Sequence, residues 1–133
     1  MPSEHRLKRR VQFYETDAAG IVHFSQYFRY MEEAEHALWR ANGLSVAPPG
    51  SELGWPRVSA SFDYHRPLRF EDEFEVVIRV TGRTEKTFRF GCVIEKNGEK
   101  VATGSFTVAC VRKVRGEPIR SVPIPQDIAE RFA

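Results

Sequence analysis

The sequence lacks several features that define whole classes of protein. It has two cysteines in 133 residues, Cys92 and Cys110, which stand far apart and without the spacing of metal ligands. No apolar run approaches the roughly 18 residues that a membrane span needs, and no apolar segment near the N-terminus resembles a signal peptide. We therefore expect a cytoplasmic protein with two buried free thiols, no metal site and no membrane span.

An excess of charge of one sign is also missing. The chain has 20 Lys and Arg residues against 18 Asp and Glu residues, for a formal net charge of +2. Domains that bind nucleic acid usually gather their cations on one face, whereas acids are interspersed here, so we expect no nucleic-acid partner. The one dense basic run, His5 to Arg10, is typical of a solvated strand edge, where charge prevents sheets from aggregating. An anionic ligand or surface is the alternative interpretation.

The spacing of apolar residues predicts one long helix that begins near Ser25. Asn42-Gly43 supplies its stop, because both residue types tolerate the left-handed conformation that closes a helix. Ser25 is acceptable by type as the N-cap, and a helix of about 18 residues is roughly 27 Å long. The apolar stripe repeats at intervals of four and three residues, at Tyr27, Met31, Ala34, Leu38 and Ala41.

Apolar and polar residues alternate through much of the remaining chain, as they do in half-buried strands. Asn97-Gly98 is a strong hairpin signal because both residues accept a positive φ, and Gly104 is a candidate bulge. Residues 44–54, rich in Pro, Gly and Ser, are expected to form a loop. The expected strands are 7–14, 58–64, 70–84, 86–96 and 101–113, with a short helix at 126–132.

The order of these elements predicts a single α+β domain over residues 1–133. The links between the later strands are short, which permits only antiparallel neighbours. One amphipathic helix can bury its stripe only against the concave face of that sheet, so we expect a five-stranded antiparallel sheet wrapped around one long central helix. Such a layer leaves sheet edges and one helix flank uncovered, and we therefore expect a homodimer or a homotetramer.

A turn that carries an acid precedes the helix. Asp17 is followed by three small residues, Ala18, Ala19 and Gly20. The first N–H groups of a helix have no intrahelical partners and carry the positive end of its dipole. We expect something negative there, either Asp17 itself or an oxygen that becomes negative during a reaction. The alternative is that Asp17 only shapes the turn or caps the helix.

The residues of this turn carry a resemblance to a known family. The stretch DAAGIVHFSQY, from Asp17 to Tyr27, resembles the signature of the hotdog-fold acyl-CoA thioesterases, in particular the 4-hydroxybenzoyl-CoA thioesterase and YbgC-like family. The resemblance includes the segments HRPLRFEDEFEV and NGEKVATGSFTVACV, and it ends in the 44–56 loop and the tail. It implies a hotdog fold and an enzyme that hydrolyses the thioester bond of an acyl-CoA.

The resemblance also implies roles for individual residues. Asp17 is the implied catalytic carboxylate, and the backbone N–H near Phe24 is the group that polarises the thioester carbonyl. Unpaired helix N–H groups suit that task on chemical grounds as well, because thioester hydrolysis develops a negative oxygen. Asp17 either attacks the carbonyl carbon to give an anhydride or deprotonates a water molecule. His23 either orients substrate or water, or packs beside the site.

Three residues near this turn are candidates for contact with the acyl group. Gly20 belongs to the turn itself. Tyr27 contributes either to an apolar acyl pocket or to an ordinary helix core. Glu32 either helps to define the acyl pocket or is a solvated or subunit-interface residue.

The remaining candidate contacts lie further along the chain. Ser59 and Ser61 are on the strand that lines the neighbouring subunit's site in relatives. Arg83 and Lys86 fall where relatives place basic residues for the CoA phosphates, and both also suit a solvated turn.

Several functions remain open at this point. An acyl-CoA thioesterase needs no separate cofactor, because CoA is part of its substrate. The alternatives are a thioesterase that acts on acyl carrier protein and a non-catalytic acyl-CoA-binding hotdog protein. The acyl group is open between aromatic groups and short or medium aliphatic chains.

Overall fold

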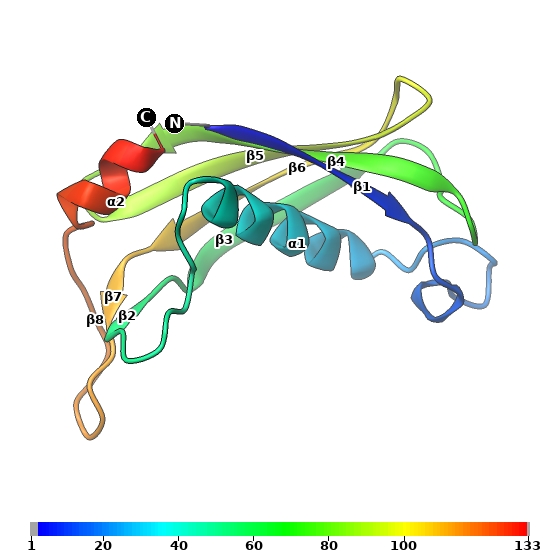
Figure 1. Cartoon of the computed structure of the whole chain (residues 1–133). Coiled ribbons are helices and arrows are strands. Elements are labelled where there is room, and N and C mark those ends of the chain that lie inside the picture. The colour runs from blue at the N-terminus through cyan, green and yellow to red at the C-terminus, as the bar shows by residue number, and fades with distance from the viewer. Residues whose placement is uncertain (1–2, 133) are drawn as a thin grey trace.

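The computed structural model describes residues 3–132 and places one long helix against the concave side of a curved sheet, as Figure 1 shows. Exposure of the apolar stripe of the helix to water is unfavourable, so the stripe packs against the apolar side chains of the sheet. In chain order the elements are β1 (Glu4–Arg10), η1 (Phe13–Glu15), α1 (Gln26–Ala41), β2 (Leu53–Gly54), β3 (Arg57–Tyr64), β4 (Glu73–Arg83), β5 (Thr87–Lys96), β6 (Glu99–Ala109), β7 (Val111–Arg112), β8 (Arg120–Ser121) and α2 (Gln126–Arg131).

The main sheet has five antiparallel strands in the order β1-β4-β5-β6-β3. This confirms the expected five-stranded sheet around one helix. Strands β1 and β3 are its two edges. A second sheet of three very short strands, β2-β7-β8, lies beside it and was not expected, because two-residue strands leave no alternation in the sequence.

The core lies between α1 and the sheet. The stripe is buried at Tyr27, Met31, Ala34 and Leu38. Ala41 is exposed, which corrects the fifth position of the stripe. The last turn of α1 packs through Trp39 instead, because the Trp39 ring lies 5.0 Å from Trp55 and 4.9 Å from Phe132 between ring centroids. Gly43 follows the helix with φ +73°, as the expected stop requires.

Three of the strands differ from those expected. The strand expected at 70–84 is Glu73–Arg83, because residues 70–71 form a turn. The first strand is Glu4–Arg10 rather than 7–14, because Phe13–Glu15 turn into a 3₁₀ helix whose acid faces inward. The strand expected at 101–113 divides at Cys110 into β6 and β7. The loop expected at 44–54 extends to residue 52, where β2 follows. The short helix expected at 126–132 is Gln126–Arg131.

Gly104 does not form the expected bulge. It pairs in register with both Cys92 and Phe62, and the irregular positions of the sheet lie elsewhere. A Cβ atom on Gly104 would lie 2.6 Å from the carbonyl oxygen of Ser61 and 2.8 Å from the ring of Phe62. Glycine is therefore required by the close approach of β3 to β6.

The two edges of the sheet differ in chemistry. On β1 the side chains of Arg6, Lys8 and Arg10 are exposed, which confirms the solvated edge expected for the basic run. Arg9 departs from that expectation, because its side chain turns inward and is 17% exposed. The other edge, β3, has the sequence RVSASFDY and is mostly exposed.

The structure also bears on the cysteines, on membrane spans and on metal sites. Cys92 and Cys110 are both buried and free, as expected, and burial raises the pKa of Cys92 to about 12. Neither helix within residues 3–132 combines the length and apolar character required to cross a bilayer. The described residues contain no group of three or more His, Cys, Asp or Glu side chains that could hold a metal ion.

Candidate active site

The turn that carries Asp17 is closed by its own hydrogen bonds. The Asp17 N–H donates to the Ile21 carbonyl and the Gly20 N–H donates to the Asp17 carbonyl, both at 2.9 Å. Gly20 has φ +78°, which explains a glycine at this corner. One carboxylate oxygen, Asp17 Oδ1, accepts the Ala19 N–H at 2.9 Å. The turn therefore orients the Asp17 side chain and leaves Oδ2 without a partner among residues 3–132.

The same turn is joined at its base to the start of α1. Thr16 and Val22 form an antiparallel bridge. The His23 N–H donates to the Glu15 carbonyl at 2.9 Å, and the Val22 N–H donates to the Leu68 carbonyl at 2.8 Å. These bonds make residues 15–23 a small hairpin with Asp17 near its tip.

The peptide between His23 and Phe24 has one side occupied and one side open. The His23 carbonyl accepts the Gln26 N–H at 2.9 Å as α1 begins. A trans peptide points its N–H opposite to its carbonyl. The Phe24 N–H therefore points away from the helix, and it has no acceptor among the described residues 3–132.

The next peptide, between Phe24 and Ser25, is held on both sides. The Tyr64 hydroxyl of β3 donates to the Phe24 carbonyl at 3.0 Å. The Ser25 N–H donates to His23 Nδ1 at 3.2 Å, and Ser25 Oγ lies 2.7 Å from the same nitrogen. Since a backbone N–H can only donate, His23 Nδ1 accepts this bond. The Phe24 backbone is thus fixed from β3 and from its own turn.

Among residues 3–132, neither a side-chain capping bond nor an acid in the first turn balances the N-terminus of α1. Ser25 occupies the N-cap position but makes no side-chain capping bond, because its hydroxyl is turned to His23. The first turn of α1 also contains no acid. The positive end of the helix dipole is therefore available to an anion or a developing negative oxygen.

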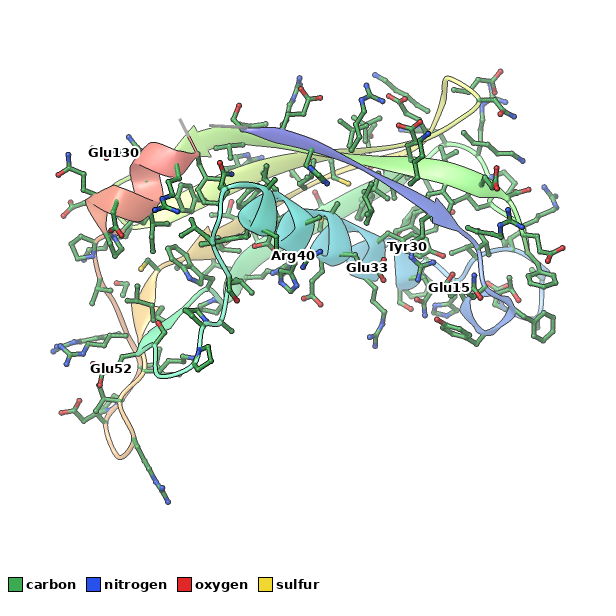
Figure 2. The ribbon with its side chains drawn as sticks, viewed as in Figure 1. Glu15, Tyr30, Glu33, Arg40, Glu52 and Glu130 are labelled. Carbon is green, nitrogen blue, oxygen red and sulfur yellow. The ribbon has the colours of Figure 1, made fainter. Side chains whose placement is uncertain are left out.

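A buried acid, Glu15, lies behind the turn, and its side chain is 2% exposed. Figure 2 shows Glu15 with Tyr30 and Glu33 where β1 ends and α1 begins. Glu15 Oε1 accepts bonds from Arg9 Nη1 and the Gln12 N–H at 2.8 Å and from the Tyr30 hydroxyl at 2.9 Å. Oε2 lies 2.6 Å from Arg9 Nη2. The network joins β1, η1 and α1.

Arg9 has two acidic partners, which explains its inward position. Its Nε donates to Glu33 Oε1 at 2.7 Å, and its guanidinium lies 4.7 Å from the centre of the Tyr30 ring. Burial lowers the pKa of Arg9, but the bonds to Glu15 and Glu33 outweigh burial and raise it. Burial likewise raises the pKa of Glu15, and the bonds from Arg9, Gln12 and Tyr30 outweigh burial and hold it below the ordinary value. Both groups are therefore charged at neutral pH.

With this geometry described, the chain can be compared with known proteins. The sequence profile of the thioesterase-like superfamily matches residues 11–132. The chain belongs to the thioesterase-like superfamily. A protein of Aquifex aeolicus (strain VF5), provisionally named an esterase, is similar to the chain at 38% identity over 125 residues, which is 92% of this chain and 93% of its own length.

Two further relatives of the chain have names that specify a substrate. A 1,4-dihydroxy-2-naphthoyl-CoA hydrolase from Synechococcus elongatus is 28% identical over 131 residues, covering 96% of this chain and 94% of its own. A solved gentisyl-coenzyme A thioesterase is similar at 27% identity with a TM-score of 0.87, covering 97% of this chain and 100% of its own. The expected hotdog fold and the expected class of enzyme, a thioester hydrolase, are thereby confirmed.

Aromatic side chains of α1 and β3 pack together near Phe24, which directly follows the Asp17 hairpin. The Tyr27 ring lies 5.0 Å from Tyr64 and 6.0 Å from Phe62, and Phe28 lies 5.2 Å from Phe62. Tyr27 is 3% exposed, and burial raises its pKa to about 12. Phe24 is 62% exposed beside these rings. Tyr27 thus belongs to the core at the start of α1, and its role as a substrate contact stays a prediction.

Glu32 lies on the exposed side of α1, with 53% of its side chain accessible. It is 3.9 Å from Arg57 Nη2, which donates at 2.7 Å to the neighbouring buried acid, Glu35. Glu35 also accepts the Trp39 Nε1–H at 3.1 Å. This second Arg–Glu pair ties α1 to β3, and it does not bring Glu32 to the Asp17 turn.

Ser59 and Ser61 lie on the opposite face of β3 from α1. Phe62 and Tyr64 contact Tyr27 of α1, and alternate residues of a strand point to opposite faces. Ser61 Oγ is accordingly 3.5 Å from Ser105 Oγ on the outer face. Within one chain these serines do not meet Asp17, and their role stays a prediction.

Arg83 and Lys86 lie at the far end of the sheet from Asp17. Arg83 pairs with Phe88, Phe88 with Val108, and Val108 with Arg57, so Arg83 lies in the same cross-strand row as Arg57, and Lys86 lies in the turn that follows Arg83. Tyr64, which bonds to Phe24, is at the other end of β3, about 23 Å along the strand. Figure 1 shows the β4–β5 turn beside α2, at the end of the molecule away from the η1 turn. One chain therefore does not join these cations to Asp17.

The sequence did not predict the roles of Glu15, Arg9 and Tyr64. Arg9 stood in a basic run that predicts exposure, and nothing in sequence shows a strand end folding over a helix. The available signal for Glu15 was its position two residues before Asp17 and directly after two aromatic residues, in FYETD. Tyr64 is 40 residues from Phe24, and only the sheet brings them together.

Proposed function

We propose that the protein hydrolyses an acyl-CoA to the free acid and CoA at the Asp17 turn. The observation that carries this proposal is the open Phe24 N–H, which is held by its neighbours directly after the hairpin that carries an oriented carboxylate. A preorganised N–H of this kind is worth about 3 kcal/mol in an acyl-transfer barrier. The names of the relatives from Synechococcus elongatus and of the gentisyl-coenzyme A thioesterase support the same reaction.

The reaction has two routes that use the same groups. In one, an oxygen of Asp17 bonds to the thioester carbon, the carbon–sulfur bond breaks, and water hydrolyses the resulting anhydride to release the acid. In the other, Asp17 takes a proton from water, the hydroxide oxygen bonds to that carbon, and the leaving thiolate takes up a proton. In both, the Phe24 N–H and the N-terminus of α1 stabilise the negative carbonyl oxygen.

We propose hydroxylated aromatic acyl groups as the preferred substrates. Phe28, Phe62 and Tyr64 are at least partly exposed and offer aromatic surface around the buried Tyr27, near the start of α1. Both named relatives act on hydroxylated aromatic acyl-CoAs by their names. Short and medium aliphatic acyl groups are the alternative outcome of the same assay.

We further propose that two copies pair through β3. The β1 edge is protected by cations, whereas β3 offers small and hydroxyl residues and an exposed Val58, which is 61% accessible. A two-fold pairing of antiparallel β3 strands sets the Arg57 end of one chain beside the Tyr64 end of the other. That arrangement brings Arg83 and Lys86 of one chain toward Asp17 of its partner, where they would meet the CoA phosphates.

Thiol release from a panel of aromatic and aliphatic acyl-CoAs tests the reaction. We expect hydrolysis by the wild type and a loss of more than about 100-fold in kcat in Asp17→Asn, with substrate binding retained. Asp127→Asn, an exposed acid on α2, is the matched control and should match the wild type. Equal activity in Asp17→Asn would show that another residue supplies the carboxylate.

The alternatives give distinct results in the same assay. Activity on acyl carrier protein thioesters but not on acyl-CoAs would show that the carrier protein, and not CoA, is the thiol component of the substrate. Binding of acyl-CoA without any thiol release would make the protein a binder.

Light scattering tests the pairing. Val58→Lys should produce monomers, because an edge lysine opposes strand pairing, whereas Ile119→Lys, at another exposed apolar residue, should not. Arg83→Ala should raise the KM for acyl-CoA but leave the KM unchanged for an acyl-pantetheine without the nucleotide. Dimers of Val58→Lys would refute pairing through β3.

A further inference from the structure

The buried acid Glu15 has no part in the proposed reaction. Its carboxylate accepts four bonds, from Arg9, Gln12 and Tyr30. These bonds replace the hydrogen bonds with water that a charged group loses on burial. Its side chain is thereby anchored to β1 and α1, two elements that the core already holds in place.

The main chain of Glu15 reaches the site from the same anchor. Its carbonyl accepts the His23 N–H, and the adjacent Thr16 pairs with Val22. The tip of the turn has no anchor of this kind, since Ala18, Ala19 and Gly20 are exposed. The position of the Asp17 carboxylate relative to α1 is therefore set at the base of the hairpin.

We propose that Glu15 is a positioning residue that holds the Asp17 carboxylate and the Phe24 N–H in one geometry. The side chain fixes residue 15 to the core, and its carbonyl fixes the peptides that lead into α1. This inference rests on the proposed function. Substitution of Glu15 would remove no group that touches the substrate, but it would displace the Asp17 carboxylate and the Phe24 N–H. A displacement of about 1 Å can lower the rate about 100-fold.

The chain contains a matched control in its other buried acid. Glu35 is 0% exposed and is likewise paired with an arginine, Arg57, at 2.7 Å. Its hydrogen bonds connect the middle of α1 to β3 and to Trp39, and none of them reaches the residues of the Asp17 hairpin. A purely structural role for Glu15 predicts that the two acids behave alike.

The experiment compares Glu15→Gln with Glu35→Gln at a temperature where circular dichroism shows both folded and light scattering shows the same assembly. Both variants should have a lower Tm. Only Glu15→Gln should lower kcat, by about 10- to 100-fold, with KM within about threefold of the wild type. Amide hydrogen exchange at residues 16–24 should also accelerate only in Glu15→Gln. Tyr30→Phe, which removes one donor to Glu15, should change both measurements less and in the same direction.

Equal losses of kcat in Glu15→Gln and Glu35→Gln, or unchanged exchange at residues 16–24 in Glu15→Gln, would overturn the inference. If Glu15→Gln does not fold, Tyr30→Phe decides by the same two measurements. If the wild type hydrolyses no thioester, the proposed function fails by itself, and the exchange comparison alone decides whether Glu15 holds the turn.

Discussion

Replacement of Gly104 by alanine tests how closely β3 lies on β6. The new Cβ would stand 2.6 Å from the Ser61 carbonyl oxygen and 2.8 Å from two ring carbons of Phe62, well inside the 3.4 Å at which ordinary contacts begin. The Phe62 ring cannot turn aside freely, because it packs on Phe28 and Tyr27. Strand β3 must move, and overpacking of this kind costs about 3 kcal/mol, near the upper end of the usual range.

Thermal and urea unfolding measure this cost. A loss of about 3 kcal/mol in a domain of this size lowers Tm by about 10 °C. Gly82→Ala is the control, because the nearest atom to its new Cβ is Arg89 Cβ at 3.8 Å, an ordinary contact. That variant should stay within about 0.5 kcal/mol of the wild type. All proteins must be compared at one concentration, since dissociation of an oligomer also changes Tm. Equal stability of the two variants would refute the argument.

Three further predictions follow from single groups. The pKa of Glu15 is held below its ordinary value of 4.5, so its ionised form stabilises the folded state fully above pH 4.5. This stabilisation is lost as the pH falls through the folded-state pKa. The Tm should therefore fall less steeply toward acid pH in Glu15→Gln than in the wild type. Tyr64→Phe, which removes the bond to the Phe24 carbonyl, should lower kcat by about 2- to 10-fold with little change in KM or Tm, and an unchanged kcat would contradict this role. Cys92, buried with a pKa of about 12, should react with a thiol reagent only after unfolding, and rapid labelling of the native protein would show that the site opens.

The elements with strong local signals were predictable. The stripe of α1 has helical periodicity, Asn97-Gly98 has the turn chemistry of its hairpin, and the strands from β3 to β6 alternate as half-buried strands do. The Asp17 turn was also visible, because small residues and glycine follow the acid. These features depend on neighbours in the chain, so the sequence contains what determines them.

The features that were missed depend on residues distant in sequence. A glycine within a strand indicates either a bulge or the close approach of a neighbouring strand. At Gly104 the position of Phe62 shows that β3 lies too close for a side chain. Ala41 continues the stripe of α1 but is exposed, and the last turn of the helix packs through Trp39 against Trp55 and Phe132 instead. Arg9 and Arg10 are adjacent in one basic run, yet Arg9 is turned to Glu15 and Glu33 whereas Arg10 pairs with Glu73 at the surface.

Local patterns in the chain are enough to specify the long helix, the antiparallel strands and the acid turn, since each depends on periodicity or on turn residues a few positions apart. The attachment of the turn depends on tertiary contacts instead. The Tyr64 hydroxyl reaches the Phe24 carbonyl across 40 residues, and Tyr30 reaches Glu15 across 15. Hydrogen bonds require atoms within about 3 Å of each other, and that proximity arises only when the sheet closes around the helix.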